Sequence, residues 1–157
     1  MTLKLMAVGK TDDKQLEALT DRYVNRLKHY IKFEIDFLAD IKNVKNLSEA
    51  QQKEKEGQLL LAKVANTDFL VLLDERGKSF SSEAFAEYLQ QRMNSGVKNL
   101  IFVIGGPYGF SEAVYERANA KVSLSAMTFS HQMIRLFVVE QLYRGFTILR
   151  NEPYHHG

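Results

Sequence analysis

The residues with the greatest chemical potential lie in the last third of this chain, between Gly105 and His155. The stretch Gly105-Gly106-Pro107-Tyr108-Gly109 directly follows an apolar run. Glycine lets a ligand come close to the main chain and leaves its N–H and C=O groups open, so this stretch is a candidate binding loop. A Gly-Gly-Pro sequence taken alone is more typical of a tight turn. The tail carries Tyr154-His155 after a stiffening proline, and this pair is either functional or part of a solvated tail.

The segment of residues 130–150 is predicted to be a helix that is apolar around nearly its whole circumference. A helix of this kind is buried on all sides. In a chain of 157 residues, one face meets the core, and we expect the other to meet a second subunit in a homodimer. Charged residues interrupt the helix, and there they must be paired or functional because burying a charge alone is costly. They are His131, Arg135, Glu140 and Arg144.

Two Gly-Lys pairs resemble phosphate-binding loops, but neither has the required spacing. Gly9-Lys10-Thr11 would need a glycine where Lys4 stands, and Gly77-Lys78-Ser79 would need one at Leu72. The glycines of residues 105–109 have the wrong spacing for a dinucleotide-binding fingerprint. No His-x-x-x-His motif and no serine nucleophile elbow occurs. These absences remove kinases, NTPases, dinucleotide oxidoreductases, zinc hydrolases and α/β-hydrolases from the leading interpretations. No metal site is predicted.

Short apolar runs alternate along the chain with amphipathic stretches, which is the pattern of βαβ units around a mainly parallel sheet. The predicted helices cover residues 13–29, 48–64, 82–94 and 130–150, with a short one from Ser111, and Gln51–Glu56 is so polar that we expect it to be exposed. The fold class is therefore α/β, a mainly parallel sheet flanked by helices in a single domain over residues 1–157. The predicted strands are Leu3–Val8, Phe33–Leu38, Phe69–Leu73, Asn99–Ile104 and Val122–Leu124.

Ligands of such sheets bind beyond the carboxyl ends of the strands. Three of these ends are chemically suggestive. They are Leu73, the Gly105-Gly106 pair, and the loop of small residues at 124–129 that enters the last helix.

Composition sets further limits. A net charge of +2, from 21 basic and 19 acidic residues, is too weak to be typical of a nucleic-acid binder. The absence of cysteine excludes a disulfide framework, a thiolate nucleophile and a Cys-ligated metal. No apolar run approaches the roughly 20 residues of a transmembrane helix, and the N-terminus lacks a secretory signal. We therefore expect a cytoplasmic protein without membrane association.

Several motifs together resemble the RlmH family, the 23S rRNA pseudouridine-N3 methyltransferases of the SPOUT superfamily. The similarity covers essentially the whole chain at matching length and motif order, and the block from Leu124 to Arg144 is its most specific part. The motifs are Ala7-Val8-Gly9-Lys10, Lys55-Glu56-Gly57-Gln58, Phe102-Val103-Ile104-Gly105-Gly106, Leu124-Ser125-x-Met127-Thr128-Phe129-x-His131-Gln132-Met133-x-Arg135, Glu140-Gln141-x-Tyr143-Arg144 and Tyr154-His155.

The resemblance implies an α/β domain with a C-terminal trefoil knot, which periodicity alone would not predict because threaded chains are rare. It also implies a homodimer, and S-adenosylmethionine as a methyl donor that needs no metal. The implied substrate is a pseudouridine in helix 69 of 23S rRNA within assembled ribosomes. The implied donor-binding residues are Leu73, Gly105, Leu124, Ser125, Ala126, Met127, Thr128 and Phe129.

The substrate side implied by the resemblance consists of His131, Arg135, Tyr143, Arg144, Tyr154 and His155. His155 or Tyr154 would help to remove the proton from base N3, and Arg135 or Arg144 would contact phosphate or stabilise the imide anion. In the rival interpretation the two arginines hold the knot and dimer together, and His131 caps or packs the last helix. Two other functions stay open: a SPOUT methyltransferase acting on tRNA, and a non-catalytic dimeric ribosome-binding protein.

Overall fold

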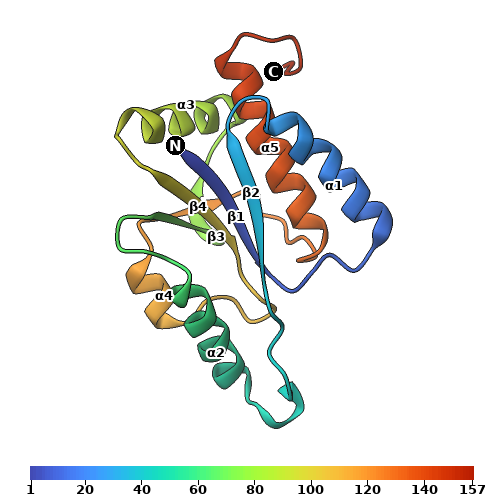
Figure 1. Cartoon of the computed structure of the whole chain (residues 1–157), viewed down its shortest axis with the longest axis vertical. Coiled ribbons are helices and arrows are strands. Elements are labelled where there is room, and N and C mark those ends of the chain that lie inside the picture. Colours follow the sequence, from blue (N-terminus) through green and yellow to red (C-terminus); the bar gives the residue numbers. More distant parts are fainter.

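The computed structural model describes all 157 residues and contains one sheet between two layers of helices (Figure 1). The five strands lie in the order β2-β1-β4-β3-β5, and every neighbouring pair is parallel. The predicted α/β class with a parallel sheet is therefore confirmed. The strands are β1 (Thr2–Val8), β2 (Lys32–Leu38), β3 (Phe69–Ser79), β4 (Asn99–Ile104) and β5 (Ala120–Ser123).

The helices begin at polar caps that the sequence supplies. The Asp13 side chain accepts hydrogen bonds from the first helical N–H groups of α1, and Ser48 with Gln51 forms the expected capping box of α2. A short 3₁₀ helix covers Val44–Asn46. None of the helices has the length and apolarity needed to cross a membrane. The helices are α1 (Lys14–Leu27), α2 (Glu49–Ala62), α3 (Ser82–Asn94), α4 (Glu112–Arg117) and α5 (Met133–Leu149).

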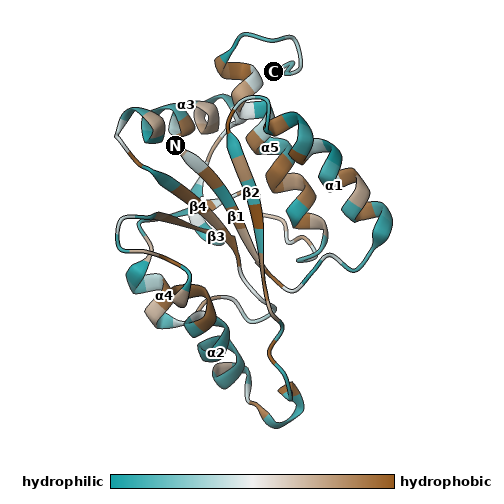
Figure 2. Ribbon diagram, in the orientation of Figure 1, coloured by the Kyte–Doolittle hydropathy of each residue, from teal (hydrophilic) through white to brown (hydrophobic).

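The sheet separates two apolar cores. On one face α1, α3 and α5 cover the sheet, and Leu142 and Phe146 of α5 are buried against it. On the other face the smaller layer of α2 and α4 buries Leu60 and Val114. The inner strand β4 is buried along nearly its whole length, as its uniform apolarity predicts. In Figure 2 the hydrophobic colour concentrates on the strands and α5, whereas α2 is largely hydrophilic.

Strand β3 continues well past the predicted end at Leu73. Its pairing with β5 shifts register between Leu73 and Lys78, and the intervening residues bulge out of the ladder. Gly77 permits the pairing to resume, because a Cβ there would lie 2.6 Å from the backbone of Lys121. The polar residues of this extension gave no strand signal, so the sequence placed the end of the strand too early.

Helix α5 packs between α1 and α3 and begins at Met133, slightly later than predicted. Its inner face is buried, but its outer face is not. Phe137 is 36% exposed and Met133 is 47% exposed. One chain therefore buries only the inner face of this helix, and the predicted second subunit would have to cover the outer apolar face. The homodimer and the trefoil knot both stay predictions.

Candidate functional site

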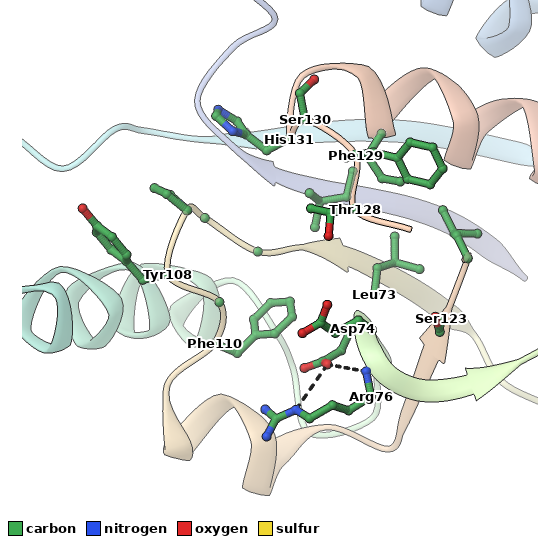
Figure 3. Close-up of a pocket in the computed structure, with 18 of the residues that line it drawn as sticks. Leu73, Asp74, Arg76, Tyr108, Phe110, Ser123, Thr128, Phe129, Ser130 and His131 are labelled. Atoms are coloured by element: carbon green, nitrogen blue, oxygen red, sulfur yellow. Dashed lines mark hydrogen bonds and ion pairs between the residues drawn. The ribbon is translucent and has the colours of Figure 1, made fainter. Parts of the chain in front are cut away.

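A cavity of about 850 Å³ lies beyond the carboxyl ends of the adjacent strands β4, β3 and β5 (Figure 3). Because these strands are parallel, their ends meet at one edge of the sheet. The walls come from the bulge after Leu73, the loop after Ile104 and the loop that leads from β5 to α5. All the predicted donor-binding residues except Ala126 line this cavity. Three segments that are distant in sequence thus form one pocket.

The glycine loop forms the wall of this cavity with its backbone. The Gly109 N–H donates to the Gly106 carbonyl at 3.1 Å, and Gly109 has a φ of +82°, which favours glycine. A Cβ on Gly105 would lie 3.2 Å from the Phe110 ring, and one on Gly106 would overlap the carboxyl of Glu56. The two inner glycines therefore allow the loop to lie directly on the side chains beneath it.

Two serine side chains stabilise the main chain of the loop between β5 and α5. The Ser123 hydroxyl donates to the Ser125 carbonyl at 3.0 Å, and the Met127 N–H donates to the Ser125 hydroxyl at 3.0 Å. Ser123 is buried, whereas the Met127 side chain is 77% exposed at the cavity mouth. These bonds fix the main chain of the loop and leave its apolar side chains free to contact a ligand.

A charged network that the sequence analysis missed lies on one side of the cavity (Figure 3). The Asp74 carboxylate accepts hydrogen bonds from the Tyr115 hydroxyl and, at 2.8 Å, from the Arg76 backbone N–H. The Arg76 guanidinium donates to the Tyr115 oxygen at 2.7 Å. Burial alone would raise the pKa of Asp74, but these hydrogen bonds outweigh it and hold the pKa below its ordinary value. The sequence did carry a signal for this network, because charged residues directly follow the apolar run Phe69–Leu73.

Glu56 lies beneath the glycine loop, although the polar run Gln51–Glu56 is predicted to be exposed. The side chain of Glu56 is only 7% exposed, so that expectation is wrong at this residue. Helix α2 turns this position toward the sheet, where the loop of Gly105 and Gly106 covers it. Its carboxyl oxygen Oε1 has no hydrogen-bond partner. Burial raises the pKa of Glu56.

Two of the predicted substrate-side residues, His131 and Arg135, lie near the start of α5 in different environments. His131 is exposed and lines the cavity, as Figure 3 shows. Arg135 is buried, outside the cavity lining, and donates to the carbonyls of Val8 at 2.7 Å and Gly9 at 2.8 Å. Its Nε donates to the His131 carbonyl at 3.0 Å. This geometry ties α5 to the end of β1 and favours the structural interpretation of Arg135.

The other four predicted substrate-side residues come together at the far end of α5. Arg144 pairs with Glu140 at 2.6 Å and bonds Nδ1 of His155 at 3.0 Å. The Tyr154 hydroxyl donates to Glu140 at 2.9 Å, and the Tyr143 and Tyr154 rings meet edge to face. Burial and hydrogen bonds with Tyr23 and Glu140 raise the pKa of Tyr154, so its hydroxyl stays protonated. The tail cluster is defined as Glu140, Tyr143, Arg144, Tyr154 and His155.

The tail cluster is separate from the cavity within one chain. None of its residues lines the cavity. From Met133, near the cavity, to Arg144 the helix rises roughly 17 Å at 1.5 Å per residue. The structure thus brings His131 to this cavity and the tail cluster to the opposite end of the same helix.

Comparison with known proteins gives a consistent result over the full chain. Residues 1–155 match a family model described as predicted SPOUT methyltransferase. The chain is 69% identical over 156 residues to ribosomal RNA large subunit methyltransferase H of Flavobacterium johnsoniae, and 68% identical to the protein of that name in Christiangramia forsetii. Each alignment covers 99% of both chains.

One solved structure supports the fold alone. It is a probable methylase family protein from Haemophilus influenzae Rd KW20, with a TM-score of 0.54 and 10% sequence identity. The similarity covers 95% of this chain and 66% of that one.

Proposed function

This chain belongs to the SPOUT methyltransferase family, and from that premise we propose that it transfers a methyl group from S-adenosylmethionine to 23S rRNA. The target that we propose is N3 of a pseudouridine in helix 69, in the assembled ribosome. The observation that carries the proposal is the cavity bounded by three strand-end loops, which contains nearly all the donor-binding residues implied by the sequence. The names of the close relatives, ribosomal RNA large subunit methyltransferase H, support an rRNA substrate.

The cavity fits the donor in size and in chemistry. Pockets for ligands of this class measure about 300–1,000 Å³ and are mostly apolar with a few fixed polar groups. Leu73, Leu124 and Phe129 offer apolar walls, and the main chain at Gly105 offers hydrogen-bonding groups close to the ligand. When bound, S-adenosylmethionine supplies an already activated methyl group on a sulfonium. The residues of this chain then need to hold that methyl in line with N3 and exclude water.

The tail cluster requires a second copy of the chain if it is to contact the substrate at the donor cavity. Its distance from the cavity along α5 excludes a direct role at the cavity of the same chain. The exposed apolar face beside the cavity gives such a copy a surface to bind, so we propose a homodimer in which each tail serves the partner's cavity. That face is formed by Met127, Phe129, Met133 and Phe137.

In such a dimer the tail cluster would bind the RNA. Arg144 is charged at all working pH values and can contact phosphate, while Tyr154 donates a hydrogen bond because its pKa is raised. His155 has both ring nitrogens engaged, one by Arg144 and one by Glu83 at 2.9 Å. Arg144 and Tyr154 both donate to Glu140, so they would contact a phosphate or a developing imide anion by exchanging that carboxylate for the substrate.

The experiment that tests this function compares three substrates side by side: intact ribosomes, free 23S rRNA and tRNA. Purified enzyme and labelled S-adenosylmethionine are added to each, and the modified base is mapped. We expect methylation of one pseudouridine in ribosomes and little in the free RNAs, because a net charge of +2 gives weak electrostatic binding. Equal activity on free rRNA would contradict the assembled-ribosome substrate, and modification of tRNA alone would contradict the rRNA function.

A further inference from the structure

The carboxyl group of Glu56 is buried but lacks a close hydrogen-bond partner within the chain. Its Oε1 makes no hydrogen bond, and its Oε2 receives only a long contact of 3.5 Å from the Gln52 side-chain amide. The other well-buried carboxyls, Asp68 and Asp74, each accept several hydrogen bonds. An unpaired buried carboxylate destabilises a fold, and groups of this kind gather at functional sites.

The position of Glu56 links it to the donor cavity. Its carboxyl packs against Gly106, which also lines the cavity. A void of about 10 Å³ lies beside it, and Lys53, Gly105 and Gly106 line both this void and the large cavity. That volume is about the minimum for a single water, which needs two to four polar partners. The Glu56 carboxyl and the loop backbone can supply them, with the Ser111 hydroxyl as a third.

Burial, more than the neighbouring charges, gives Glu56 a carboxyl group that takes up a proton readily. Burial raises its pKa, the Gln52 hydrogen bond lowers it, the Asp40 carboxylate raises it, and His131 lowers it when protonated. Lys53 lies one turn away on the same helix and also faces the void. The net effect is a raised pKa, which lies closer to the working pH. A general base is most efficient when its pKa is near that pH.

We propose that Glu56 accepts, through one water in this void, the proton that leaves the substrate base during methyl transfer. The proposal rests on the proposed function and extends it, because the two possible proton acceptors of the tail cluster, Glu140 and His155, already accept hydrogen bonds within the chain. The N3–H bond breaks and its proton passes to the water, which gives a proton to the Glu56 carboxylate. The N3–CH₃ bond forms as the S–CH₃ bond breaks, and that electron pair stays on the sulfur, leaving a neutral thioether. The carboxylic acid of Glu56 later returns its proton to solvent.

The test is single-turnover methylation of ribosomes by wild type, Glu56→Gln and Glu54→Gln between pH 6 and pH 9. Glutamine keeps the shape of the side chain but cannot accept the proton, so we expect a rate about 100-fold lower at pH 7. The Glu56→Gln rate should rise about tenfold per pH unit as the imide ionises unaided, whereas the wild-type rate stays nearly level. Glu54 is exposed on the same helix, and its variant should behave as wild type.

A second readout does not depend on activity. When the pKa of a carboxyl group is higher in the folded chain than in the unfolded chain, the free energy of unfolding falls as the pH rises between these two values. Glu56→Gln removes this loss, so its melting temperature should exceed that of wild type at pH 8 and approach it at low pH. A structural carboxylate would give the opposite result, a variant that is less stable at pH 8.

The outcomes separate this proposal from the function on which it rests. A wild type that fails to methylate ribosomes overturns the function, and this proposal with it. An active wild type with a Glu56→Gln variant of equal rate overturns only the role of Glu56. A variant that is slower by the same factor at every pH also overturns it, because a positioning defect would not add a pH dependence. A Glu56→Gln chain that does not fold contradicts it too, since the carboxylate would then hold the structure together.

Discussion

At the scale of single residues, the buried polar groups at and near the cavity are paired with partners far away in the sequence. Asp74 is bonded by Tyr115, which comes from the neighbouring helix α4. Arg135 bonds carbonyls at the end of β1. Burying such groups without partners would destabilise the fold, so the Asp74 pairing holds part of the cavity wall and the Arg135 pairing holds the start of α5. Glu56 is the contrast, because it lies at the same edge and stays unpaired.

Tyr115→Phe tests the network at Asp74. The variant loses the hydrogen bond to a buried carboxylate, and we expect it to lower the free energy of unfolding by about 1.5–3 kcal/mol at pH 7. Urea unfolding measures this difference. Tyr108→Phe is the matched control, because the Tyr108 side chain is 43% exposed and its hydroxyl makes no hydrogen bond within the chain.

The same variant has a pH dependence with a defined sign. Asp74 has a lowered pKa in the folded chain, so its contribution is complete above the ordinary pKa and is lost as pH falls through the lowered value. Without Tyr115 that value rises, and the contribution should be lost at a higher pH. The stability difference between wild type and variant should therefore shrink below about pH 4. A difference that stays constant down to pH 2 would contradict the assignment.

Arg135→Ala tests whether this arginine is structural. Its removal leaves the Val8 and Gly9 carbonyls buried without a donor, and we expect a loss of about 3 kcal/mol or more in the free energy of unfolding. Arg22→Ala, at an exposed position of α1, should change stability little. If Arg135→Ala kept full stability but lost methyl transfer, the substrate role implied by the sequence would be correct instead.

At the scale of elements, the sequence predicted the parts of the site that follow from apolar periodicity. The buried strands β3 and β4 were recognisable because both of their faces are covered, so they read as continuous apolar runs. Parallel strands place their carboxyl ends at one edge, so the meeting of Leu73, Gly105 and the loop of residues 124–129 could be expected. The capping box at Ser48 was predicted from its local spacing and confirmed.

The remainder of the site depends on tertiary contacts that leave little local signal. Glu56 stands in a polar run, and only the covering of α2 by the glycine loop buries it. The extension of β3 consists of polar residues that pair because β5 lies beside them. The separation of the tail cluster from the cavity depends on the direction of α5, which periodicity predicts as a helix but does not orient.

Helix α5 allows a direct test of a tail that acts on the partner's cavity. Gly105→Val should displace the glycine loop and so distort the cavity, because a Cβ there already lies 3.2 Å from the Phe110 ring. His155→Ala should abolish the tail function and leave S-adenosylmethionine binding unchanged by calorimetry. Each homodimer should be inactive, whereas co-expression of the two variants should restore about a quarter of the sites, by random pairing in a symmetric dimer. Mixed dimers without activity would show that each tail serves its own chain.

At the scale of the whole molecule, the exposed apolar face predicts how copies assemble. Phe137 is 36% exposed on that face, so Phe137→Glu should leave the fold of one chain intact. The charge would have to be buried in a dimer interface, which is costly. In sedimentation we expect wild type at twice the 18.0 kDa of one chain, and the variant at 18.0 kDa without methyl transfer. A wild type that sediments as a monomer would contradict the dimer.

The attachment of α5 to β1 also governs the order in which a newly made chain can acquire its structure. Arg135 bonds the end of β1 from a position 126 residues after Gly9, and the apolar face of α1 packs on the sheet but lacks the cover of α5 until that helix arrives. Contacts between such distant segments form slowly, because a long loop must close first. The N-terminal half therefore waits, incompletely packed, until the last helix has been synthesised. Premature termination before α5 should yield a chain that chaperones and proteases recognise, rather than a smaller stable domain.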